Sequence, residues 1–73
     1  MAEQVLLWHP YATKRNQDGS TERLWTVDGC PDKEKALDAI RKWADDYGYH
    51  LISAEIKVSN LKRPDMYEWI RVF

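Results

Sequence analysis

Only one stretch of this 73-residue sequence repeats its apolar residues with helical spacing. The stretch opens at residues 29–32 and closes at Gly48, and it predicts one helix with one apolar face. Pro31 suits the first helical position, and Gly48 suits a left-handed residue after the last turn. The apolar positions are Ala36, Leu37, Ile40, Trp43, Ala44 and Tyr47. Because one helix covers one face of a sheet, any sheet in this chain keeps its other face open.

The rest of the sequence predicts four strands. The strand segments are 4–12, 22–28, 49–59 and 67–73, and the polar stretches 13–21 and 60–65 join the first and last pairs as hairpins. With the helix in the middle, the layout is ββαββ. If the helix runs antiparallel to its flanking strands, the first and third strands pair at the centre. We therefore expect a two-layer α+β domain over residues 1–73, with a four-stranded antiparallel sheet in the order 2-1-3-4.

Alternation along the strands predicts which side chains face the helix. In the third strand, the residues expected inward are His50, Ile52, Ala54, Ile56 and Val58, which leaves Leu51 on the open face. In the second strand, Leu24 is expected on the open face, and Trp25 falls on the other face. The last strand is apolar on both faces. If Met66, Ile70 and Val72 face the core, then Tyr67, Trp69 and Phe73 flank Arg71 on the open face.

The open face is therefore the predicted binding surface. Trp, Tyr and Arg are the residue types that dominate interface hot spots. The first strand adds Trp8 or Leu7, because the run 5–8 has no alternation that would decide between them. The predicted partner-binding residues are Tyr67, Trp69, Arg71, Phe73, Leu24, Leu51 and Trp8. This pattern favours a non-enzymatic protein-binding domain.

The charge of the chain limits the alternatives. The sequence has 11 basic and 12 acidic residues and a formal charge of −1, which argues against a protein that binds DNA by overall charge. Lys62 and Arg63, together with Arg71 and the neighbouring rings, nevertheless make a basic aromatic strip. Single-stranded nucleic acid stacked on that strip is the alternative ligand. A third possibility is a structural homodimer, because the last strand lies at an unprotected edge of the sheet.

Catalytic and metal-binding patterns are weak. Cys30 precedes the helix and could be paired with His9 or His50 as a nucleophile and its base, but no motif frames such a pair. The same three residues lack the close spacing of structural zinc ligands. We therefore predict no enzyme activity, no metal site and no cofactor. One cysteine, no basic leader before residue 5 and no apolar run long enough for a membrane span favour the cytoplasm.

The middle of the chain resembles a class of small bacteriophage proteins in its layout. A strand ends in a polar turn, a helix follows with the run 35–43, and Gly48-Tyr49 leads into the strand residues 51–56. This arrangement is similar to that of phage inhibitors of host RNA polymerase and of some anti-CRISPR proteins, and it covers about half of the chain. The resemblance implies a protein that binds a large host complex and blocks it sterically. It identifies no individual functional residue.

Overall fold

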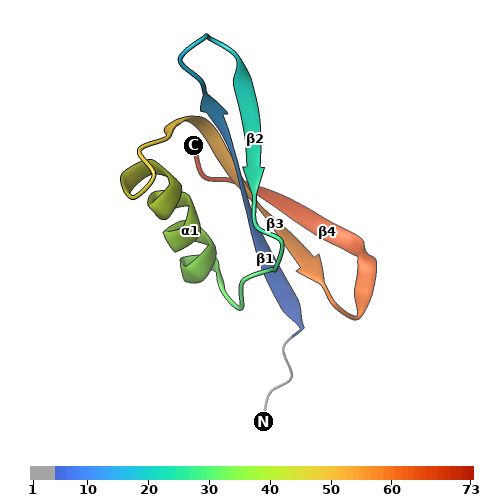
Figure 1. Cartoon of the computed structure of the whole chain (residues 1–73). Coiled ribbons are helices and arrows are strands. Elements are labelled where there is room, and N and C mark those ends of the chain that lie inside the picture. Colours follow the sequence, from blue (N-terminus) through green and yellow to red (C-terminus); the bar gives the residue numbers. More distant parts are fainter. Residues whose placement is uncertain (1–4) are drawn as a thin grey trace.

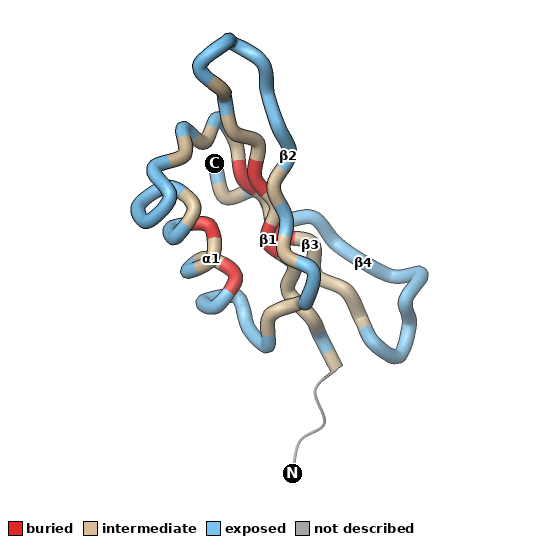
Figure 2. The backbone as a smooth tube through the Cα atoms, viewed as in Figure 1, coloured by how far each residue is buried: buried red, intermediate tan, exposed pale blue. Residues whose placement is uncertain are grey.

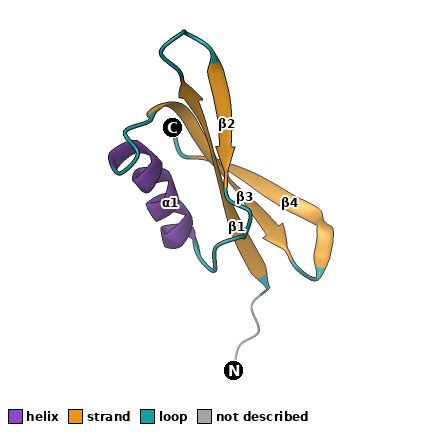
Figure 3. Cartoon of the chain, in the orientation of Figure 1, coloured by secondary structure: helices purple, strands orange, loops and turns teal. Residues whose placement is uncertain are grey.

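The computed structural model describes residues 5–73, which form four strands and one helix in the predicted ββαββ order (Figure 1). Gln4, where the first strand is expected to begin, lies outside the described residues. The elements are β1 (Leu6–Arg15), β2 (Thr21–Trp25), α1 (Lys33–Asp45), β3 (His50–Asn60) and β4 (Arg63–Arg71). The strands form one antiparallel sheet in the order β2-β1-β3-β4, and α1 lies on one side of it (Figure 3). The predicted fold class and strand order are confirmed.

Small side chains bring α1 against the centre of the sheet. Ala12 of β1 lies directly opposite Ala54 of β3, and both are fully buried together with Ala36 of α1. Ile40 and Ile56 complete the buried cluster, which lies between α1 and the two central strands (Figure 2). Half-buried side chains surround this cluster: Trp8, Leu24, Cys30, Leu37, Trp43, Leu51, Val58, Ile70 and Val72.

β1 runs through Pro10 to Arg15, beyond its predicted end. Proline has no N–H for a ladder, so the sequence suggests an edge or a bulge there. Trp8 and Cys30 exchange two backbone hydrogen bonds of 2.9 and 2.7 Å on the β2 side of β1, so the even-numbered residues of β1 direct their backbone groups to that side. β2 pairs with β1 only from Tyr11 onward. The Pro10 nitrogen therefore falls in the gap before β2, and no ladder bond is lost.

α1 begins at an acidic cap. The Asp32 carboxylate accepts a hydrogen bond of 2.8 Å from the backbone N–H of Lys35, and the helix starts at Lys33. Pro31 thus precedes the cap, and the expectation that it occupies the first helical position is wrong. With Pro31 as the first helical residue, Cys30 would have to be the N-cap. A short carboxylate side chain caps the first turn well, whereas a thiol does not, so Asp32 is the cap.

The C-terminal end of α1 follows the prediction at Gly48, which has a φ of 68° in the left-handed region. The N–H of Tyr49 donates to the carbonyl of Trp43 at 3.0 Å. The predicted apolar stripe extends too far, because Ala44 and Tyr47 are exposed. Tyr47 lies past the end of α1 and stacks on Tyr49, with ring centroids 5.5 Å apart.

A β-bulge changes the facing of the first residues of β3. Thr13 pairs with Ser53 but Lys14 pairs with Leu51, which leaves Ile52 as the extra residue. Leu51 consequently packs against the core cluster, and Ile52 is 40% exposed. The assignments of Ile52 to the core and of Leu51 to the open face are therefore wrong, since one extra residue shifts the phase of the alternation.

The pairing with β1 also decides how β2 faces. Leu24 lies directly opposite the buried Ala12, and such residues share a face, so Leu24 packs against the core. Trp25 lies opposite Tyr11 and is 60% exposed. The placement of Leu24 on the open face is wrong, because alternation separates two sets of residues without saying which set faces the helix.

β4 faces as predicted over its C-terminal half. Ile70 lies opposite the buried Ile56 and, like Val72, packs against the core. Met66, expected inward, is exposed. The pairing with β3 skips residues 64–66, so Met66 has left the regular ladder.

The bulge predicts an order of stability losses. We expect Ile56→Ala to lower the free energy of unfolding by about 3 kcal/mol and Leu51→Ala by about 2 kcal/mol, because each removes packed core methyl groups. Ile52→Ala is expected to cost less than about 1 kcal/mol, since Ile52 is substantially exposed. Urea unfolding followed by circular dichroism measures all three. A larger loss for Ile52→Ala than for Leu51→Ala would contradict the bulge.

Candidate binding surface

The face of the sheet opposite α1, here called the open face, is covered by no element of residues 5–73 (Figure 1). Its side chains follow from the pairing registers and alternate with the core-facing residues. The open face carries Arg23 and Trp25 from β2, Leu7, His9, Tyr11 and Thr13 from β1, Ser53, Glu55, Lys57 and Ser59 from β3, and Tyr67, Trp69 and Arg71 from β4.

Aromatic rings cross the open face from one edge strand to the other. Trp25 of β2 lies opposite Tyr11 of β1. Tyr11 reaches across β3 to Trp69 of β4, with ring centroids 5.1 Å apart and planes tilted by 57°. This tilted arrangement is favourable for two aromatic rings. Trp25, Tyr67 and Trp69 remain 60%, 53% and 50% exposed.

Cationic side chains lie over these rings. The Lys57 ammonium lies 4.5 Å from the centroid of Tyr67 and 6.0 Å from that of Trp69. The Arg23 guanidinium lies 5.2 Å from the centroid of Tyr11. These cation–π contacts restrict the rings while leaving them accessible to solvent.

Arg23 is held from two further directions. Its guanidinium forms an ion pair with Glu55 and donates to the Thr13 hydroxyl at 3.1 Å. The open face therefore carries three permanent cations, Arg23, Lys57 and Arg71, against the single carboxylate of Glu55. The chain as a whole is slightly acidic, so positive charge is concentrated on this face.

The structure divides the predicted site residues into three groups. Tyr67, Trp69 and Arg71 lie together on the open face as expected. Phe73 is half exposed at the end of the chain, where its backbone N–H and carbonyl bond to Ala54. Leu24, Leu51 and Trp8 pack instead against the core cluster on the helix side, and Leu7 takes the open-face position in β1.

Of the two residues named as possible nucleic-acid contacts, Lys62 lies in the turn between β3 and β4, and Arg63 is the first residue of β4. Lys62 and Arg63 are exposed, and their backbone N–H groups donate to the side chain of Asn60 at 2.9 and 3.2 Å. The Arg63 guanidinium contacts the sulfur of Met66 at 3.9 Å. Both residues sit at the tip of the hairpin, away from the rings of Tyr11 and Trp25.

Sequence reasoning missed Trp25, Tyr11, Arg23 and Lys57 as members of the same surface. Arg23 and Trp25 alternate with Leu24, the residue of the second strand expected on the open face, and the undecided facing of the run 5–8 leaves that of Tyr11 open. Lys57 alternates in step with Leu51 and is thus expected on the open face, but it is not among the predicted binding residues. The signal that could have found them is the pair Ala12 and Ala54, two small residues suited to a close approach of the helix. Once these face α1, parity places Tyr11 and Lys57 on the opposite side.

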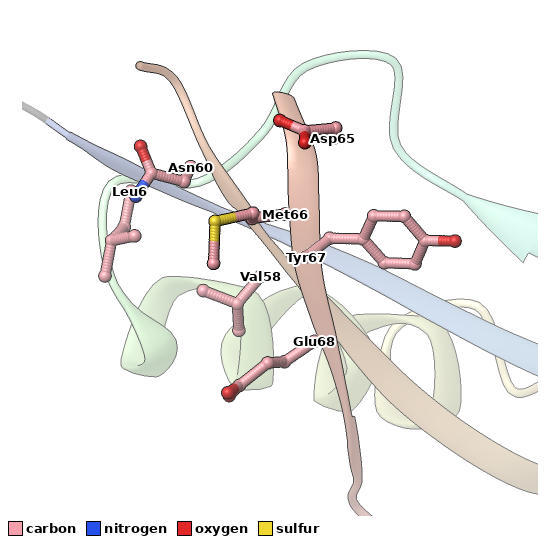
Figure 4. A pocket seen from close by; sticks show the side chains of 7 residues that line it. All are labelled: Leu6, Val58, Asn60, Asp65, Met66, Tyr67 and Glu68. Atoms are coloured by element: carbon pink, nitrogen blue, oxygen red, sulfur yellow. The ribbon is translucent and has the colours of Figure 1, made fainter. Parts of the chain in front are cut away.

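A concavity lies beside the β3–β4 hairpin. It is an open groove of about 770 Å³. Figure 4 shows Met66 and Glu68 on one side of β4 and Tyr67 on the other. The residues that line the groove are Leu6, Val58, Asn60, Asp65, Met66, Tyr67 and Glu68. It combines the carboxylates of Asp65 and Glu68 with apolar side chains.

The structure shows the surroundings of the candidate nucleophile and its two candidate bases. Burial and the nearby Asp32 carboxylate raise the pKa of the Cys30 thiol, the opposite of what an activated thiolate needs. His9 lies with Leu7 against Gly29, where an added Cβ would come within 2.8 Å of the imidazole. His50, expected to face inward, is exposed at the start of β3. Within residues 5–73, no group of three or more His, Cys, Asp or Glu side chains could hold a metal ion.

No helix in the described part of the chain has the length and apolar character needed to cross a membrane. Comparison with protein-family models, with characterised proteins and with solved structures finds no match.

The raised pKa of Cys30 predicts a pH effect on stability. The folded state favours the neutral thiol, so stability is undiminished below the unfolded-state pKa of about 8.5 and falls as the pH rises above it. Replacing the thiol in Cys30→Ala should remove this alkaline loss. Urea unfolding of both proteins from neutral to alkaline pH measures it. Parallel pH profiles for the two proteins would contradict the assignment.

Proposed function

We propose that this chain is a non-enzymatic binding domain whose open face docks on a protein partner. The observation that carries the proposal is a continuous row of aromatic side chains, from Trp25 through Tyr11 and Trp69 to Tyr67, on a face that nothing covers within residues 5–73. Exposed aromatic area of this kind on a small domain marks an interaction surface.

The contacts within the open face favour tight binding. Lys57 and Arg23 lie over the rings of Tyr67 and Tyr11, so the rings lose little conformational freedom when a partner covers them. Arg71 is exposed beside Trp69 and can donate several hydrogen bonds in a fixed geometry. Together these side chains provide apolar area for burial and hydrogen bonds of defined direction.

The proposed mechanism is occlusion of a larger complex. An aromatic sheet face can cover a partner's functional surface without chemistry of its own. This is the mode of action that the resemblance to small phage inhibitors implies. The free cysteine suits a reducing compartment, and we place the action in the cytoplasm.

Single-stranded nucleic acid is the second candidate ligand of the same face. Three cations against one carboxylate, interleaved with four rings, is an arrangement that can stack bases and neutralise phosphates. Salt separates the two ligands, because nucleic-acid affinity falls steeply with rising salt whereas ring-driven protein binding does not.

Removal of single rings tests the proposal. We expect Trp69→Ala and Trp25→Ala each to weaken partner binding by about 2 kcal/mol, roughly thirtyfold in Kd, with the fold retained because both rings are largely exposed. Tyr47→Ala is the matched control, since Tyr47 is equally exposed but lies beyond α1 and off the open face.

The partner for this test is isolated with tagged protein from a bacterial lysate, with and without nuclease, and affinities are then measured by calorimetry. Equal losses for Trp69→Ala and Tyr47→Ala would contradict the open face as the binding surface. A ligand that is destroyed by nuclease, or whose binding is lost steeply between low and physiological salt, would replace the protein partner with nucleic acid.

A further inference from the structure

Within residues 5–73, β4 leaves a long edge of the sheet unpaired. It is the last strand in the order β2-β1-β3-β4 and spans Arg63–Arg71, whereas the other edge strand, β2, has only five residues. Pro64 protects only the first end of β4. The segment 65–71 contains no proline and no lysine, two of the residue types that usually block edge pairing, and its charged residues are Asp65, Glu68 and Arg71.

The backbone of this edge has a defined set of outward groups. Val72 donates its N–H to the carbonyl of Ala54 in β3 at 2.9 Å. Hydrogen bonding alternates along an antiparallel pair, so Glu68 and Ile70, the even-numbered residues in the regular part of β4, bond to β3. Tyr67, Trp69 and Arg71 therefore direct their N–H and carbonyl groups away from the sheet.

We propose that two copies of this chain associate by antiparallel pairing of β4 with β4, centred on Glu68. In this register Tyr67 faces Trp69 of the other copy, and Asp65 faces Arg71 of the other copy. Met66 likewise faces Ile70. By symmetry each pair occurs twice, so the strand is complementary to itself in ring, charge and apolar contacts.

Registers shifted by two residues, which use the same outward backbone groups, are less favourable. Sliding by two residues in one direction sets Arg71 against Arg63 twice and brings Pro64 into the ladder. Sliding by two in the other direction leaves only residues 67–71 within both strands. The central register ends just after Pro64, and its one unfavourable pair is Glu68 facing Glu68.

Pairing in this register would join two sheets into one of eight strands. The side chains of Tyr67 and Trp69 lie on the open face in each copy, so the rings of both copies would meet at its centre. The association uses backbone groups of the edge and does not depend on the proposed protein partner. Trp25, on the opposite edge strand, takes no part in it.

Charge exchange at the edge tests the register. Sedimentation equilibrium of the full chain, from micromolar to millimolar concentration, should show a monomer–dimer equilibrium. Arg71→Asp should weaken it roughly tenfold, because two opposite-charge pairs become like-charge pairs. The double variant Asp65→Arg/Arg71→Asp should recover most of the affinity. Arg15→Asp, with the same charge change at the far end of β1, is the control and should leave the affinity unchanged.

Glu68→Gln should change the dimer affinity in the opposite direction. It removes the single like-charge pair at the centre and should strengthen association several-fold with little change in side-chain size. It also keeps the test decisive if Arg71→Asp fails to fold, which circular dichroism detects. A wild-type chain that is monomeric at every concentration overturns the proposal, as does a dimer whose affinity ignores both Glu68→Gln and the charge exchange. Trp25→Ala should weaken binding of the protein partner but leave dimerisation unchanged. This variant therefore distinguishes failure of the dimer proposal from failure of the proposed function.

Discussion

The pairing of β1 with β3 beneath α1 is the interaction on which the rest of the structure depends. Ala12 and Ala54 lie directly opposite each other, and their small side chains admit Ala36 of the helix. Hydrophobic burial at this point decides which alternate residues of β1 and β3 face the helix. Because directly paired residues share a face, it also decides this for the edge strands. Leu24 and Ile70 face the helix for this reason, and the row of rings is left on the open face.

The same constraint explains how so small a chain can carry an aromatic surface. Within residues 5–73 the buried side chains are Pro10, two isoleucines and three alanines, so much of the apolar area lies in half-buried residues around them. On the open face, Arg23 and Lys57 cover parts of the rings and the ion pair with Glu55 fixes Arg23. Stability and recognition therefore share Tyr11, whereas Trp25 and Trp69 are largely available for binding.

β4 combines two properties that follow from one alternation. Its odd-numbered residues place their side chains on the open face and their backbone groups at the free edge. Tyr67, Trp69 and Arg71 are thus the residues through which either a partner on the face or a second copy at the edge would meet the protein. A domain built this way can enlarge its binding face by self-association without any change of fold.

The sequence by itself determined the fold, because the helical stripe, the strand alternation and the turn residues are local signals that agree with one another. It also placed Tyr67, Trp69 and Arg71 on the open face, since Ile70 and Val72 clearly belong to a core. Only the tertiary structure decided the phase of β1 and β2 and of the first residues of β3. Leu24 and Leu51 turned inward, and Trp25 and Tyr11 joined the surface, because register and a bulge arise from pairing between segments distant in the chain.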